Sequence, residues 1–156
     1  MAEESTTKAE RQFTLQKIYV KDISFETPNS PEIFTLQWEP KIELNLASNA
    51  KQLQDGLFDV VLTVTLTVKV GDKTAYLVEI AQAGIFSALG FSEAEMGQLL
   101  GSYCPTVLFP YAREAVSDLV GKGGFPPMLL APVNFDALYV QHLQQAQQQA
   151  EASTSH

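Results

Sequence analysis

A strict alternation of apolar and polar positions over residues 57–70 is the strongest pattern in the chain. Every second side chain from Phe58 to Val70 is apolar, whereas the positions between them are mostly threonine or charged. A period of two over this length predicts a long strand with one buried face in an antiparallel sheet. Gly71-Asp72 then predicts a two-residue turn into a return strand over residues 74–86.

Three earlier segments complete the extended part of the chain. Residues 41–46 alternate apolar and polar side chains, and residues 13–25 predict a strand with apolar side chains on both faces. Pro31 and Pro40 bracket residues 33–40, which we predict to be an extended crossing segment rather than a full strand. Simple alternation along the first strand would place five of its apolar and aromatic residues on one face: Phe13, Leu15, Tyr19, Ile23 and Phe25.

The periodicity becomes helical after residue 90. Ser92 and Glu95 match a capping box, and apolar residues continue at helical spacing to Val120, where a glycine-rich loop begins. Asn134 predicts the cap of a final helix. Strands followed by helices predict one α+β domain, with a four-stranded antiparallel sheet and two to three helices. We expect this domain over residues 12–145, with disordered tails at residues 1–11 and 146–156.

Composition and charge narrow the class of protein. The 156 residues are 46% hydrophobic, which is enough to bury a core. The net charge of −8 argues against binding to nucleic acid or anionic lipid, because both depend on Lys and Arg. A single cysteine fits a reducing compartment. The start lacks a secretory signal pattern and no apolar run is long enough for a membrane span, so we expect a cytoplasmic protein without membrane insertion.

Groups suited to catalysis or metal binding are sparse. Cys104 would need a histidine base to act as a nucleophile, and the two histidines, His142 and His156, lie near the C-terminal end. A small buried apolar side chain is the simpler interpretation of this cysteine. One cysteine and two late histidines do not match the ligand spacing of a zinc site. We therefore predict no enzyme, no metal and no cofactor.

The chain has more apolar side chains than one small domain can bury, and such a surplus usually marks an interface. One use is self-association. The other is a groove for foreign chains, walled by the segments around Trp38 and residues 42–46 and covered by the final helix. Core packing is the competing interpretation of these residues. The groove set that we predict comprises Phe34, Trp38, Ile42, Leu44, Leu46, Met128, Leu129 and Leu130.

Several stretches between about residues 13 and 145 match a known family pattern. Gly84-Ile85-Phe86 and Phe125-Pro126 are two of them, and Trp38 with Pro40 is a third. The longer ones are residues 18–28 (IYVKDISFETP), 103–114 (YCPTVLFPYARE) and 130–138 (LAPVNFDAL). In these stretches the chain resembles the SecB family of bacterial protein-export chaperones.

The resemblance implies a dimer of dimers (a homotetramer) that captures unfolded precursor proteins in the cytoplasm. It also implies delivery to the export ATPase SecA, whose basic C-terminal tail would dock on acidic sheet surface. The positions that match this docking surface are Asp22, Glu26, Leu77 and Glu79. Because folding hides the apolar side chains of a client, such a chaperone needs no ATP to select unfolded chains. A small hydrophobic-ligand binding module, an assembly adaptor and an enzyme built on the three carboxylates remain the alternatives.

Overall fold

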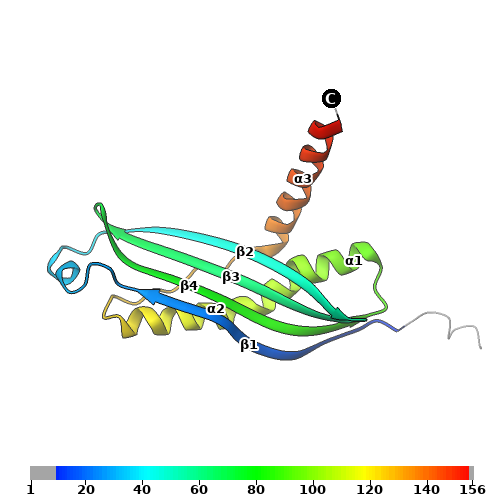
Figure 1. Cartoon of the computed structure of the whole chain (residues 1–156), viewed down its shortest axis with the longest axis horizontal. Helices are drawn as coiled ribbons and strands as arrows, with labels where there is room; N and C mark the ends of the chain where they lie inside the picture. The colour runs from blue at the N-terminus through cyan, green and yellow to red at the C-terminus, as the bar shows by residue number, and fades with distance from the viewer. Residues whose placement is uncertain (1–9, 155–156) are drawn as a thin grey trace, which may run out of the picture.

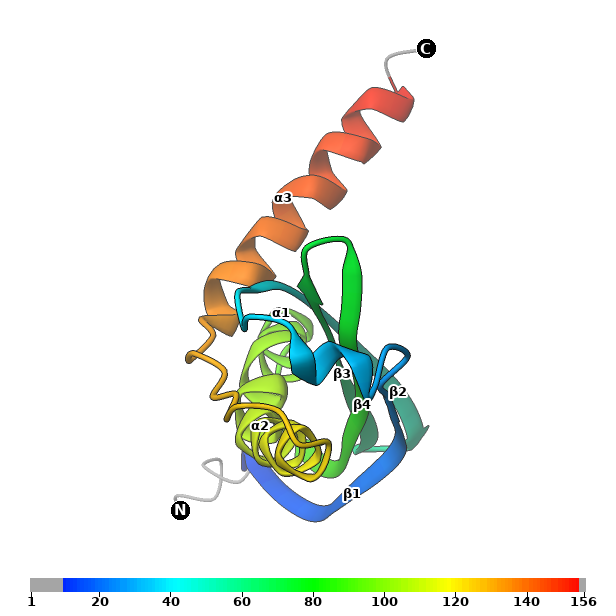
Figure 2. The same ribbon diagram turned by 90° about the vertical axis from the view of Figure 1, so that its left-hand side faces the viewer.

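The computed structural model describes residues 10–154, which form a four-stranded antiparallel sheet with helices packed on one face (Figures 1 and 2). The strand order is β1-β4-β3-β2. This α+β architecture confirms the predicted fold class. In chain order the elements are β1 (Gln12–Glu26), the 3₁₀ turn η2 (Glu32–Thr35), β2 (Pro40–Gln54), β3 (Leu57–Val70), β4 (Lys73–Leu89), α1 (Glu93–Gln98), the π-helical turn η3 (Leu99–Tyr103), α2 (Cys104–Lys122) and α3 (Phe135–Thr154).

The core lies between the two central strands and α2, which packs on β4 and β3. The alternating face of β3 is buried as predicted, and the bounds of this strand match the sequence pattern. On β4 the side chains of Tyr76, Val78 and Ile80 are fully buried beside them. From α2 the helical-period residues Leu108, Ala112 and Val116 complete the core. The alternating apolar face of the strands and the apolar face of α2 thus pack together in one layer.

Strand β1 departs from the single parity that its sequence predicted. Register shifts between Leu15 and Lys17, and between Val20 and Asp22, insert one extra residue at each place. Such a bulge exchanges the two faces of a strand. The stretch between the bulges is therefore inverted, with Ile18 on the helix side and Tyr19 on the outer side, whereas Phe13 and Phe25 both face the helices. Sequence alternation alone does not reveal where a bulge falls.

The segment before β2 is not simply extended, because residues 32–35 form the turn η2 before the chain runs on to Pro40. Strand β2 is also longer than residues 41–46 and continues to Gln54, paired along its length with β3. Polar side chains from Ser48 to Gln54 interrupt the apolar pattern. Backbone pairing with a buried neighbour overrides that weak local preference.

Helices α1 and α3 begin where the sequence predicted. The Ser92 side chain accepts a hydrogen bond from the Glu95 backbone N–H, and the Glu95 carboxylate accepts one from the Ser92 backbone N–H. The Ala137 backbone N–H donates to Asn134 Oδ1 at 3.0 Å, which confirms the cap of α3. Between α1 and α2 the helix widens into the π-helical turn η3, a local feature often found at functional sites.

Helix α3 continues to Thr154 and projects away from the sheet (Figures 1 and 2). The predicted disorder of residues 146–156 is therefore wrong up to Thr154. Gln and Ala favour helix, and this segment has no glycine or proline to end it. The predicted N-terminal tail, residues 1–11, lies almost wholly outside the described residues. Among the helices that the structure describes, none is long and apolar enough to cross a membrane.

Candidate functional site

The helix-facing side of β2 carries an uncovered apolar strip. Ile42, Leu44 and Leu46 pair with Val68, Leu66 and Val64 of β3, so their side chains point to the same face as the core. Helix α2 packs on the central strands, and β2 lies at the edge of the sheet beyond them. Ile42 is 54% exposed and Leu44 is 36% exposed as a result. We call these three residues the apolar strip.

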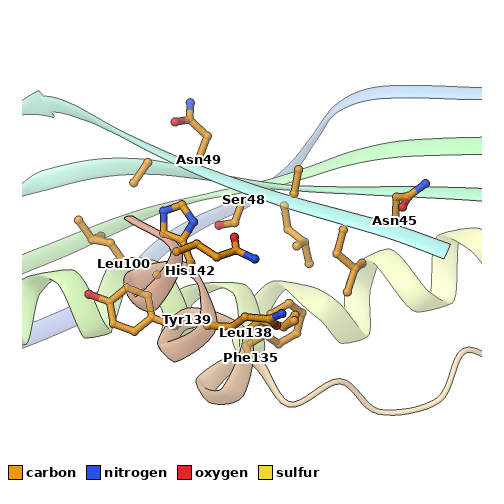
Figure 3. A pocket seen from close by; sticks show the side chains of 15 residues that line it. Asn45, Ser48, Asn49, Leu100, Phe135, Leu138, Tyr139 and His142 are labelled. Atoms are coloured by element: carbon orange, nitrogen blue, oxygen red, sulfur yellow. The ribbon is translucent and has the colours of Figure 1, made fainter. Parts of the chain in front are cut away.

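A large hollow lies at one end of this strip, between β2 and α3 (Figure 3). Its volume is about 970 Å³. Leu46 and Leu62 form the apolar part of the sheet wall, whereas α3 contributes side chains from successive turns on one side of the helix. The residues contributed by α3 are Phe135, Leu138, Tyr139, Gln141, His142 and Gln145. We call this hollow the β2–α3 groove.

The sheet wall of the groove is a strand edge rather than a strand face. Six consecutive residues of β2, Asn45 to Ala50, line the groove, although alternate side chains point to opposite faces. A hollow lined by both parities must run along the edge. Strand β2 pairs with β3 alone in the sheet, so its outer edge presents backbone N–H and C=O groups to the groove. The groove therefore offers both apolar side chains and strand-pairing groups.

A smaller hollow of about 180 Å³ lies near the start of β2 and is walled by aromatic rings. The ring centroid of Phe125 lies 5.1 Å from Phe34, 5.8 Å from Trp38 and 4.8 Å from Tyr76. Ile33, Leu36 and Pro126 complete its lining. These distances are typical of packed aromatic pairs, so the rings support one another around the opening. We call this site the aromatic hollow.

The structure divides the predicted groove residues among these features. Phe34 and Trp38 line the aromatic hollow, and Ile42, Leu44 and Leu46 form the strip that leads from it toward the β2–α3 groove. The loop residues behave differently from one another. Met128 packs against the core, Leu129 is 79% exposed, and Leu130 is buried within the core. Leu130 is thus a correction to the predicted set, because three adjacent residues of an irregular loop cannot all face the same way.

Sequence reasoning did not assign α3 residues by number to the groove, although it predicted the final helix as a cover. Phe135, Leu138, Tyr139 and His142 follow the spacing i, i+3, i+4, i+7, which places them on one helix face. That periodicity is the signal that finds them. Leu100 and Gly101 of η3 also line the groove. Their contribution depends on the π-helical turn, which no sequence pattern indicated.

The four residues matched to the partner-docking surface lie together on the outer face of the sheet. Glu26 is directly opposite Leu77 in the β1–β4 register, and Ser24 is opposite Glu79. Asp22 is opposite Ala81, one further step along the same face. The three carboxylate residues are exposed and Leu77 is half-buried. This face is turned away from the helices, so it is separated from the apolar strip by the thickness of the sheet.

A partly buried network of Tyr19, Lys21 and Asp59 on the outer face was not predicted. The Tyr19 hydroxyl donates to Asp59 Oδ1 at 2.5 Å, and Lys21 Nζ lies 4.0 Å from Asp59 Oδ2. This hydrogen bond, together with burial and the charge of Asp59, raises the pKa of Tyr19 to about 12. Tyr19 reaches Asp59 because the β1 bulge turns it to the outer face. The pair ties the edge strand β1 to β3 across β4.

Cys104 is fully buried, and this burial raises the pKa of its thiol to about 12. A nucleophilic cysteine needs the thiolate, which such a pKa disfavours strongly. His142, the candidate base, lines the β2–α3 groove instead. Cys104 therefore acts as a small apolar core residue.

The comparisons with known proteins identify the family. The family model described as preprotein translocase subunit SecB matches residues 6–146. The chain belongs to the SecB family. A protein-export protein SecB of Methylococcus capsulatus is 71% identical over 98% of this chain and 99% of its own length. The SecB of Nitrosococcus oceani is 54% identical over the full length of both chains. Membership of the SecB family gives this chain a chaperone role in protein export, as the resemblance predicted.

Comparison with solved structures supports the same fold. A SecB-like chaperone of Mycobacterium tuberculosis, solved in complex with a peptide from an antitoxin, matches with a TM-score of 0.62. The alignment covers 78% of this chain and 90% of the other at 19% sequence identity. At that identity the likeness shows the fold alone.

Proposed function

We propose that this SecB-family chain holds unfolded precursor proteins in an export-competent state, without ATP and without catalysis. The observation that carries the proposal is a succession of three apolar features along one edge of the sheet, which we call the client path. The path begins at the aromatic hollow, follows the apolar strip and ends in the β2–α3 groove. A folded domain has no extended apolar segment to place along such a path, whereas an unfolded chain has many.

The dimensions of the path suit an extended peptide. From Ile42 to Ala50 the strand advances eight residue steps, which is about 27 Å at the spacing of a β-strand. A client segment of similar length would lie beside β2 and pair with its free edge, since main-chain bonding does not depend on client sequence. Apolar client side chains would then enter the two hollows. This arrangement explains how one site accepts many unrelated sequences.

The energetics favour capture that is reversible. Each apolar client side chain that becomes fully buried contributes about 1.5–3 kcal/mol. Association and ordering of the flexible client oppose much of that gain. Several such paths on one oligomer would act together on a long client, since the second contact is intramolecular once the first has formed. Release then follows from client folding or transfer, and no nucleotide hydrolysis is required.

Delivery and assembly form the second part of the proposal. The outer-face residues Asp22, Glu26, Leu77 and Glu79 would receive the basic C-terminal tail of SecA, with the carboxylates pairing with its cations and Leu77 providing an apolar contact. The chain would work in the cytoplasm as a dimer of dimers. The exposed apolar side chains of edge strand β1, Leu15, Val20 and Ile23, support self-association.

A titration tests the central claim. Trp38 is the only tryptophan of the chain and lines the aromatic hollow, so its emission reports on occupancy there. A tryptophan-free client is titrated in a permanently unfolded form, with its cysteines reduced and blocked, and in its folded form. We expect an emission shift that saturates with the unfolded form alone. Equal affinity for the two forms would contradict the proposal.

Two other outcomes would direct attention to the alternative functions. Binding of a small hydrophobic compound with no binding of any unfolded chain would make the β2–α3 groove a small-ligand site. Its volume of about 970 Å³ lies at the upper end of the range for such sites. Binding of SecA with no binding of unfolded chains would make the protein an assembly adaptor. Each outcome is measured with the same preparation.

A further inference from the structure

Two glycines bring α3 unusually close to the helical segment that precedes α2. The ring of Tyr139 lies against Gly97 of α1 and Gly101 of η3, one helical turn apart. A Cβ added at Gly97 would lie 2.5 Å from Tyr139 Oη, with the next ring atom, Cζ, at 3.8 Å. A Cβ at Gly101 would clash with ring carbons, lying 2.5 Å from Tyr139 Cε1. Only glycine at both positions leaves room for the tyrosine ring.

Polar contacts fix the same turn of α3. Asp136 Oδ1 accepts a hydrogen bond from Gln98 Nε2 at 2.9 Å and a short one from the Ser102 hydroxyl. Phe135 packs edge-on against Phe109 of α2, with ring centroids 5.7 Å apart. By contrast, residues 143–154 of α3 are all exposed. The position of the whole helix is therefore set at its first two turns.

We propose that Gly97, Gly101 and Tyr139 form a latch that sets the width of the β2–α3 groove and thereby the affinity for clients. The proposal rests on the proposed function, since it assumes that clients occupy this groove. All three act as positioning residues. Gly101 and Tyr139 also line the groove, and Leu138 and His142 lie on the same helix as Tyr139 (Figure 3). A displacement of the Tyr139 ring therefore moves the helical wall of the groove relative to β2.

The contact at Gly97 allows a sharp test because it concerns a single atom. Gly97→Ala places a methyl group against the Tyr139 hydroxyl, so we expect weaker client binding, by about tenfold, from the cost of overpacking. Tyr139→Phe removes that hydroxyl and leaves the remaining ring atom at ordinary contact distance. The double variant Gly97→Ala/Tyr139→Phe should therefore bind clients nearly as well as the wild-type protein.

The contact at Gly101 provides the complementary arm. Gly101→Ala clashes with the ring itself, which phenylalanine retains, so Tyr139→Phe should not rescue it. Gly121→Ala is the matched control, because Gly121 lies in helix α2 and a Cβ there would meet nothing within 4 Å. That substitution should leave client affinity unchanged. Native mass and thermal unfolding of each variant establish that the fold and the assembly are retained.

Hydrogen exchange in the free protein measures how firmly α3 is held, independently of clients. We expect faster exchange of the α3 amides in Gly97→Ala and Gly101→Ala, and wild-type exchange in Gly97→Ala/Tyr139→Phe and Gly121→Ala. Failure of Tyr139→Phe to rescue Gly97→Ala would overturn the latch. Faster α3 exchange with unchanged client affinity would overturn its link to groove width. A wild-type protein that binds no unfolded client would instead refute the proposed function, with the exchange data still deciding whether the glycine contacts position α3.

Discussion

Substitution of Ile42 by serine tests whether clients contact the apolar strip. The Ile42 side chain is 54% exposed, so more than half of its surface is available to a bound client. A fully buried isoleucine contributes about 1.5–3 kcal/mol, and the exposed share corresponds to about 0.8–1.6 kcal/mol. Ile42→Ser should therefore raise the Kd of a client about 4- to 15-fold. The loss in fold stability should be modest, because this side chain lies at the edge of the core.

The assay requires a short client, so that binding at several sites does not mask the loss at one. A fluorescent apolar peptide of about ten residues, the length of the strip and groove together, is suitable for anisotropy titration. Val140→Ser provides the control. Val140 is 50% exposed on α3 but does not line the groove, so a comparable loss of exposed apolar surface there should leave Kd unchanged. An unchanged Kd in Ile42→Ser, or an equal rise of Kd in both variants, would refute the proposal that clients contact the apolar strip.

Four single residues give further expected outcomes. Glu79→Lys should weaken binding of the SecA tail more than client binding, because it reverses a charge on the proposed docking face. Glu151→Lys, an equal charge change on distal α3, should change neither binding affinity. Equal losses of SecA-tail affinity in the two variants would contradict the docking face. Tyr76→Phe should raise the free energy of unfolding in urea by about 1–3 kcal/mol, because the buried Tyr76 hydroxyl has no hydrogen-bond partner within the described residues. A lower free energy of unfolding in this variant would contradict the prediction. The hydrogen bond to Asp59 and burial raise the pKa of Tyr19 to about 12. The contribution of the Tyr19 hydroxyl to the free energy of unfolding should therefore be complete below pH 10 and disappear as the pH rises through 12. A difference in unfolding free energy between wild type and Tyr19→Phe that stays constant over that range would contradict this prediction. Because burial raises the pKa of Cys104 to about 12, iodoacetamide at about pH 8 should label the unfolded but not the native protein, and rapid native labelling would be the contrary result.

Periodic patterns gave reliable predictions where one physical effect acted alone. Strand β3 is central, pairs on both sides and buries one face, so its alternation gives its bounds and its core residues. The caps at Ser92 and Asn134 are equally local, since each satisfies backbone groups within three residues of itself. The docking set on β1 and β4 came from the family resemblance, and the register places its members side by side.

The remaining errors arise where a long-range or irregular feature decides the outcome. The two bulges of β1 invert Tyr19 and Ile18, although every residue type in that strand suits the simple alternation. Leu130 follows Leu129 in a loop with no period, so the sequence does not distinguish the buried residue from the exposed one. The groove itself is assembled from β2, η3 and α3, which are far apart in the chain. Its helical wall follows a detectable period, but its width depends on glycine contacts that only the packed structure reveals.

The alternation of β2 and β4 also separates the two proposed activities in space. On β2 the apolar strip faces the helices. On β4 the buried Val78 and Ile80 also face the helices, whereas the alternate docking residues Leu77 and Glu79 face the opposite way. The strip lies on one edge strand of the sheet, whereas Asp22 and Glu26 lie on the other edge strand. A client on β2 therefore leaves the proposed SecA surface free. If both sites are used, transfer proceeds through a ternary complex, and any influence of one ligand on the other must pass through the sheet rather than through direct competition.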